Sequence, residues 1–88
     1  PDPTSPLPRS ALVVDDLPSA RRWLRAALLD AFPEVSIAEA GSLADARAAL
    51  VALGKAPDLA LIDLGLPDGS GLRLIEALQR DGVGTLCI

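Results

Sequence analysis

Residues 59–72 read LALIDLGLPDGSGL: four apolar residues lead into a single acid, Asp63, and a loop rich in Pro and Gly follows. Residues 11–16, ALVVDD, have the same form, because an apolar run ends in the acid pair Asp15 and Asp16. Short apolar runs bounded by turn signals are typical of buried strands. The two stretches therefore predict two central strands of one sheet, each with acid at its carboxyl end.

Three helical stretches separate these strands from two further strand-like ones. The helices are expected over residues 15–33, 41–54 and 70–82, each closed by a Pro or a Gly. Residues 35–40 alternate in polarity, which predicts a strand at the rim of the sheet, and residues 85–88 (TLCI) predict a last strand. The order β-α-β-α-β-α-β predicts an α/β fold with a doubly wound parallel sheet.

In such a sheet the three acids are expected to lie close together. In the flavodoxin-like strand order 2-1-3-4, the first and third strands are neighbours, about 4.8 Å apart, so Asp15, Asp16 and Asp63 converge at one edge. Two like charges about 4 Å apart repel by about 4 kcal/mol at an effective dielectric constant near 20, so the cluster needs a proton or a cation. Oxygen ligands favour Mg²⁺ or Mn²⁺, and a carboxylate beside such an ion could accept a phosphoryl group.

Each acid also has a simpler interpretation. Asp15 or Asp16 alone could cap the helix that follows, and Asp63 alone could begin a turn. The joint occurrence of acids after two apolar strands favours a metal and phosphoryl site over turn chemistry.

Composition excludes several classes of function. Eight basic and twelve acidic residues give a net charge of −4, which argues against a nucleic-acid-binding surface. No apolar run approaches the roughly 20 residues of a membrane span, and the single Cys87 cannot form an internal disulfide, so a reducing, cytoplasmic setting is expected. Residues 1–10 are rich in Pro and predict a mobile tail, which leaves residues 11–88 as one small domain.

Residues 11–88 resemble the receiver domain of bacterial two-component response regulators. LVVDD is similar to the acidic pocket of that family, and DLALIDLGLPDGSGL is similar to its phosphoacceptor strand and loop. The resemblance implies that Asp63 is the phosphoacceptor and that Asp16 is a direct Mg²⁺ (or Mn²⁺) ligand. It implies that Asp15 helps to hold the ion, partly through water, and that Gly65 offers its backbone carbonyl to the metal.

The same resemblance implies further roles. Pro67 and Gly71 would shape the loop, and Arg21, Arg22 and Trp23 would lie near the surface to which a sensor histidine kinase or phosphotransfer protein docks. The chain would then be a phosphoacceptor signalling domain that controls an output activity, transcription being the expected one, and not an enzyme.

The sequence departs from the family at its end. Ile88 precedes the expected Ser or Thr that senses the phosphoryl group and the fifth strand with its Lys, so a truncated receiver with the fifth strand missing is expected. The exposed last strand is then expected to support a homodimer. A phosphorylation-independent interaction or oligomerisation module is the alternative function. A haloacid-dehalogenase-like phosphatase is disfavoured, because its DxDx(T/V) pattern is replaced by DDLPS.

Overall fold

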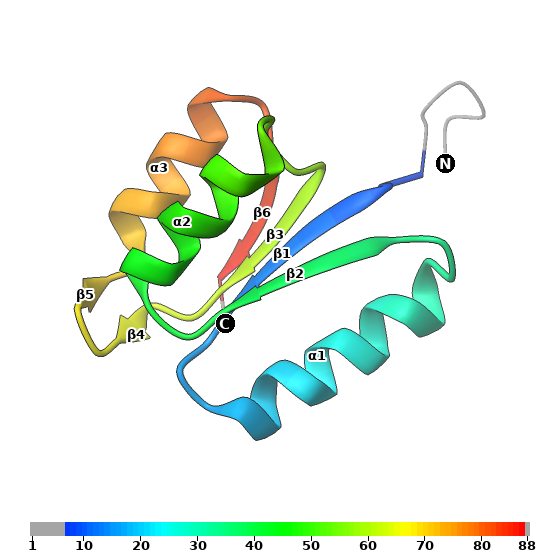
Figure 1. The fold of residues 1–88 in the computed structure, drawn as a ribbon, viewed down its shortest axis with the longest axis horizontal. Coiled ribbons are helices and arrows are strands. Elements are labelled where there is room, and N and C mark those ends of the chain that lie inside the picture. Colours follow the sequence, from blue (N-terminus) through cyan, green and yellow to red (C-terminus); the bar gives the residue numbers. More distant parts are fainter. Residues whose placement is uncertain (1–6, 88) are drawn as a thin grey trace.

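Strands and helices alternate along the chain in the computed structural model, which describes residues 7–87 (Figure 1). In chain order the elements are β1 (Ser10–Val14), α1 (Pro18–Ala31), β2 (Ser36–Ala40), α2 (Leu43–Leu53), β3 (Leu59–Ile62), β4 (Gly65–Leu66), β5 (Gly69–Ser70), α3 (Leu72–Arg80) and β6 (Gly84–Cys87).

The four longer strands form one parallel sheet in the order β2-β1-β3-β6. β6 is the fourth strand of the predicted order 2-1-3-4, because β4 and β5 pair only with each other. The flavodoxin-like α/β fold is therefore confirmed, and β2 lies at one rim, as its alternating sequence predicts. In the β1–β3 register Val14 is opposite Ile62, so the acids that follow these two residues emerge side by side.

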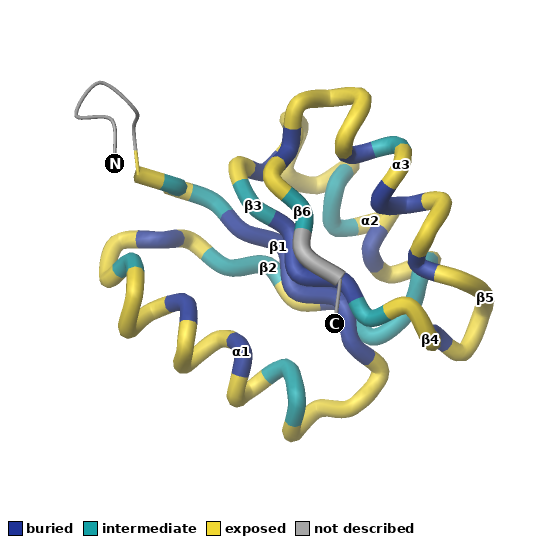
Figure 2. The backbone as a smooth tube through the Cα atoms, turned by 180° about the vertical axis from the view of Figure 1, so that it is seen from behind, coloured by how far each residue is buried: buried dark blue, intermediate teal, exposed yellow. Residues whose placement is uncertain are grey.

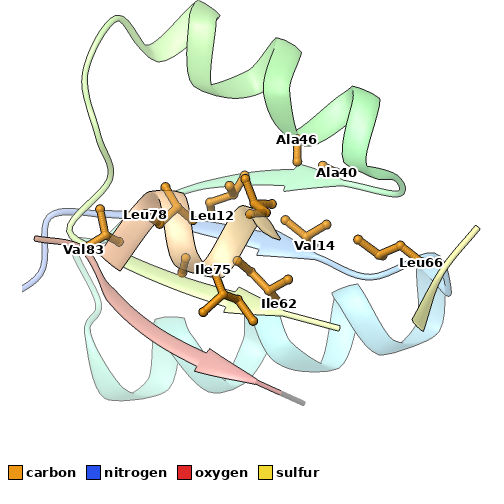
Figure 3. Close-up of a cluster of buried hydrophobic side chains, with 11 residues drawn as sticks. Leu12, Val14, Ala40, Ala46, Ile62, Leu66, Ile75, Leu78 and Val83 are labelled. Atoms are coloured by element: carbon orange, nitrogen blue, oxygen red, sulfur yellow. The ribbon is translucent and has the colours of Figure 1, made fainter. Parts of the chain in front are cut away.

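The two faces of the sheet have separate cores. α2 and α3 cover one face and α1 covers the other (Figure 1). Successive residues of β1 point to opposite faces: Leu12 and Val14 join the α2–α3 cluster, and Ala11 and Val13 join the α1 cluster. Figure 3 shows the larger cluster, in which Val83 lies at one end and Leu66 at the other. Burial of each large side chain contributes about 1.5–3 kcal/mol, so β1 is the best-anchored strand.

α1 is covered on a narrower stripe than its sequence predicts. The spacing of Leu24, Ala27, Leu28 and Ala31 predicts that they share the inward face of the helix, but only Leu24 and Leu28 are buried, and Ala27 and Ala31 are exposed. Figure 2 shows most of α1 as exposed. The helix packs alone on its side of the sheet, so only its central apolar row reaches the strands. The simpler interpretation of Asp15 or Asp16 as a helix cap is not supported, since Leu17 holds the N-cap position and the helix has no side-chain cap.

α2 is capped at both ends, and Gly54 closes it as predicted. The Ser42 side chain accepts a hydrogen bond from the Asp45 N–H at 3.1 Å, and Gly54 ends the helix in the left-handed region with φ 71°. The predicted mobile tail, residues 1–10, falls outside the described residues as far as residue 6, whereas Ser10 already belongs to β1. The division into tail and domain stays a prediction. No helix within residues 7–87 is long and apolar enough to span a membrane.

Candidate functional site

Three acids meet at the carboxyl edge of the sheet. One oxygen from each of Asp15, Asp16 and Asp63 lies within 4.8 Å of the others. The strand ladder continues into this edge, because the Asp63 N–H donates to the Val14 carbonyl at 2.9 Å and the Asp15 N–H donates to the Ala40 carbonyl at 3.0 Å. The sheet itself therefore positions the backbone of two of the three acids, as the sequence predicts.

Exposure to solvent rises across the cluster. Asp15 is 5 % exposed, Asp63 is half-buried and Asp16 is exposed. The two less exposed carboxylates are each held by a backbone N–H two residues further on: Asp15 Oδ1 accepts from Leu17, and Asp63 Oδ1 accepts from Gly65, both at 3.0 Å. The cluster is thus fixed on its inner side and open to water at Asp16.

The donor set suits a hard divalent cation. Carboxylate oxygens are the ligands that Mg²⁺ and Mn²⁺ prefer, and the chain contains no His. Mg²⁺ usually takes one or two carboxylates and keeps several waters, which fits a cluster with one side open to solvent. The fourth predicted ligand, the Gly65 carbonyl, stays a prediction; the recorded contact of Gly65 is made through its N–H.

The loop after Asp63 contains a short hairpin that the sequence did not reveal. β4 and β5 pair antiparallel, with Gly65 opposite Ser70 and Leu66 opposite Gly69. Pro67 lies in the turn between them, where a fixed φ suits the second residue of a turn. The loop-shaping role of Pro67 stays a prediction. The hairpin was not predicted because two-residue strands are too short to carry a periodic signal.

Gly71 packs directly against the backbone of Asp63. A Cβ atom at this position would lie 2.6 Å from the Asp63 carbonyl oxygen and 2.8 Å from Ile62 Cγ2, which is closer than atoms can approach. Its φ of −66° is ordinary, so the requirement for Gly is steric and not conformational. Gly65 differs, because a Cβ there would meet only Asp63 Oδ1, at 3.9 Å.

Gly71→Ala is therefore expected to destabilise the chain by about 1–3 kcal/mol, the usual cost of overpacking. Gly65→Ala is the matched control in the same loop, and it is expected to stay within about 0.5 kcal/mol of wild type. Urea unfolding monitored by circular dichroism measures both changes. Equal stability of the two variants would contradict the packing of Gly71 against Asp63.

Arg21 contacts the acid cluster from α1. Its Nη1 donates to the Asp15 carbonyl oxygen, and its Nε lies 3.6 Å from Glu39 Oε1 on β2. Arg22 and Trp23 are exposed, Trp23 at 71 %. The three residues predicted to face a kinase are thus of two kinds, since Arg21 is engaged within the chain while its two neighbours are accessible. Their docking role stays a prediction.

Two acids outside the cluster fasten distant segments together, and sequence reasoning missed both. Asp68 Oδ1 and Oδ2 accept the N–H groups of Leu43 and Ala44, at 2.8 and 3.0 Å, in the first turn of α2. Asp58 Oδ2 accepts the N–H groups of Arg9 and Ser10, at 2.8 and 3.3 Å, at the amino end of β1. Such contacts join residues far apart in the chain, so no local pattern signals them.

These contacts lower the pKa of both acids. The N–H of Arg9 chiefly lowers the pKa of Asp58, with smaller contributions from the N–H of Ser10 and from Lys55. The N–H groups of Leu43 and Ala44 lower the pKa of Asp68. A lowered folded-state pKa means that each group stabilises the fold above its unfolded pKa, about 3.9, and that this stabilisation is lost as the pH falls through the folded pKa.

The double variant Asp58→Asn with Asp68→Asn is therefore expected to lose less stability than wild type on acidification from about pH 6 to about pH 2. Asparagine keeps an acceptor oxygen but cannot be protonated in this range, so the part of the acid sensitivity due to these two groups disappears. Urea midpoints at the two pH values give the comparison. An unchanged acid sensitivity would show that the two contacts stabilise the ionised and the protonated carboxyl groups equally.

Comparison with known proteins agrees with this geometry. A family model described as "Response regulator receiver domain" matches residues 11–88. The chain is 41% identical over 70 residues to a protein-glutamate methylesterase/protein-glutamine glutaminase of Agrobacterium fabrum, covering 78% of this chain and 19% of that protein. It is 39% identical over 71 residues to the KDP operon transcriptional regulatory protein KdpE of Escherichia coli, covering 81% and 30%.

A solved structure has the same architecture. A mutant of the response regulator MaeR bound to sulfate superposes with a TM-score of 0.78 at 25% sequence identity, over 93% of this chain and 67% of that one. The chain spans less than a third of the length of the two curated relatives.

Proposed function

Because the chain belongs to the response regulator receiver domain family, we propose that Asp63 accepts a phosphoryl group from a sensor histidine kinase or phosphotransfer protein. The observation that carries the proposal is the meeting of three carboxylates within 4.8 Å at the carboxyl ends of β1 and β3. A rigid strand end delivers Asp63 to this position, and its half-buried side chain remains reachable from solvent.

The two carboxylate oxygens of Asp63 differ in their hydrogen bonding. Oδ1 is held by the Gly65 N–H, and among residues 7–87 no donor is recorded for Oδ2. In transfer from a phosphohistidine, a carboxylate oxygen forms a bond to phosphorus as the P–N bond breaks and the histidine keeps the electron pair. Mg²⁺ held by Asp15, Asp16 and Asp63, with the Gly65 carbonyl, would offset the negative charge that gathers between carboxylate and phosphoryl oxygens.

Acetyl phosphate tests the proposal without a kinase. Wild type, Asp63→Asn and Asp58→Asn are incubated with acetyl phosphate and Mg²⁺, and phosphoryl incorporation is measured by intact-mass spectrometry. Wild type and Asp58→Asn are expected to gain the phosphoryl mass and Asp63→Asn is not. An unmodified wild type, or a modified Asp63→Asn variant, would contradict the assignment of Asp63.

The domain is a signalling unit, and the relatives differ in the output that they carry. KdpE is a transcriptional regulatory protein and the other relative is a methylesterase/glutaminase, so related receivers occur in proteins with different outputs. We propose that transcription is the output controlled here, and that this chain itself is a phosphoacceptor and not an enzyme.

A phosphorylation-independent interaction module is the second candidate. Within the described residues β6 pairs with β3 alone and forms the second edge of the sheet, and edge strands offer unpaired N–H and C=O groups to another copy. The 88-residue chain is therefore expected to form a homodimer through β6. Light scattering over a concentration series measures this, and a constant monomer mass at the highest concentration would contradict it. Folding and self-association that are the same with and without Mg²⁺ and acetyl phosphate would favour this second function.

A further inference from the structure

Asp68 links the hairpin after the phosphoacceptor to a helix elsewhere in the chain. Its two carboxylate oxygens take the N–H groups of Leu43 and Ala44 in the first turn of α2. Hydrogen bonds to a charged acceptor are stronger than neutral ones, and the positive end of the helix dipole favours them further. The helix's own cap, Ser42, serves only the N–H of Asp45. α2 therefore depends on the hairpin for two of its first-turn bonds.

The hairpin in turn depends on α2. A two-residue ladder is too short to be stable alone, so β4 and β5 need contacts outside themselves. Leu66 provides the apolar contact, since it is buried at one end of the larger core cluster (Figure 3). Asp68 provides the polar contact on the turn beside it. Figure 1 shows β4 and β5 next to the first turn of α2.

The hairpin also holds the phosphoacceptor. Gly65, its first residue, donates its N–H to Asp63 Oδ1 at 3.0 Å. Gly71, directly after its last residue, donates its N–H to the Leu64 carbonyl at 3.1 Å and packs against the Asp63 carbonyl. A shift of the hairpin would therefore move the N–H that orients the Asp63 carboxylate.

We propose that Asp68 is a positioning residue for the phosphoacceptor site: it fastens the hairpin to α2, and the hairpin sets the orientation of Asp63. Asp68 would act through Gly65, and it is not one of the three acids that would hold the metal. The inference rests on the proposed function, because it assumes that the acid cluster binds a divalent cation.

Asp58 offers a matched control. Its carboxylate also accepts two backbone N–H groups from a distant segment, those of Arg9 and Ser10, and it is also exposed. It precedes β3, whereas Asp63 follows it, so Asp58 lies at the opposite edge of the sheet from the acid cluster. Its replacement removes the same kind of contact and the same charge without touching the hairpin.

The experiment compares Asp68→Ala, Asp68→Asn, Asp58→Ala and Asp58→Asn with wild type. Mg²⁺ binding is measured by isothermal titration calorimetry at about 0.15 M salt, which screens charge effects over more than about 8 Å. Asp68→Ala is expected to weaken Mg²⁺ binding about tenfold, the lower end of the cost of losing an outer-shell partner. Asp68→Asn keeps an acceptor oxygen and is expected to lose about threefold, while both Asp58 variants stay within about twofold of wild type.

Amide hydrogen exchange gives a second readout. Exchange at Gly65 is expected to accelerate in Asp68→Ala and not in Asp58→Ala, although urea unfolding should show that both variants lose stability.

Asp68 and Asp58 variants with equal Mg²⁺ affinity would overturn the inference, whether both match wild type or both are weakened. If Asp68→Ala does not fold, the comparison of Asp68→Asn with Asp58→Asn decides in the same way. A wild type that binds no Mg²⁺ would overturn the proposed function and this inference together, whereas a binding wild type with an unaffected Asp68→Ala overturns the inference alone.

Discussion

Val13→Asp is expected to leave the chain unfolded. Val13 is fully buried in β1, between Glu39 of β2 and Leu61 of β3, and its side chain packs in the cluster under α1. An aspartate there would be an unpaired charge without a hydrogen-bond partner, at a cost of several kcal/mol. Small domains have a total stability of about 5–15 kcal/mol, and one of this size lies toward the lower end.

Val51→Asp provides the control for this experiment. Val51 is also a valine, but it is 82 % exposed on α2, so the same substitution is expected to change the stability by less than about 0.5 kcal/mol. Circular dichroism and thermal melting of the two variants give the comparison. A cooperative melt of Val13→Asp near the wild-type midpoint would mean that β1 is not a central strand covered on both faces.

Asp63→Asn is expected to make the metal-free chain more stable and to remove its response to Mg²⁺. The substitution takes one of three negative charges out of a cluster whose oxygens lie within 4.8 Å. Repulsion at about 4 Å is worth about 1 kcal/mol in water and about 4 kcal/mol at an effective dielectric constant near 20. Because Asp16 is exposed and Asp63 is half-buried, a gain near the lower value is expected.

Mg²⁺ should stabilise the wild-type chain as well, because it offsets the same repulsion among the three acids. At a concentration 100 times the Kd, a ligand that binds only the folded state adds about 2.7 kcal/mol to the free energy of unfolding. Urea unfolding with and without Mg²⁺ measures this, and Glu76→Gln, which removes an exposed charge on α3, is the control that should keep the response. Wild-type stability that is indifferent to Mg²⁺ and to Asp63→Asn would contradict the clustered-acid description.

The sheet could be predicted from the sequence because strands that are buried on both faces have continuously apolar sequences. Residues 11–14 and 59–62 are continuously apolar, which identified β1 and β3 as central strands, and the mixed pattern of β2 identified a rim. The acid cluster followed from the same reasoning, since neighbouring parallel strands deliver their carboxyl ends to one edge. In the structure one oxygen from each of the three acids lies within 4.8 Å of the others, which agrees with this expectation.

Other contacts could not be predicted, because they depend on where the fold brings separate segments together. Asp68 is 24 and 25 positions away from the N–H groups that it accepts, and in the sequence it is only one more acid in a turn. Arg21 belongs to the polar side of α1 by pattern, yet its guanidinium reaches the Asp15 carbonyl. The exposure of Ala27 and Ala31 likewise depends on how closely α1 approaches the sheet, which its periodicity does not state.

The central position of β1 also determines the order in which the chain can fold during synthesis. Of the four strands of this sheet β1 is made first, and its partners begin only at Ser36 on one side and Leu59 on the other. The entropic cost of closing such long loops precedes any gain from pairing, so a parallel sheet of this kind has a high contact order and folds slowly. On the ribosome, β1 remains a short apolar segment without its second partner until β3 has emerged from the exit tunnel.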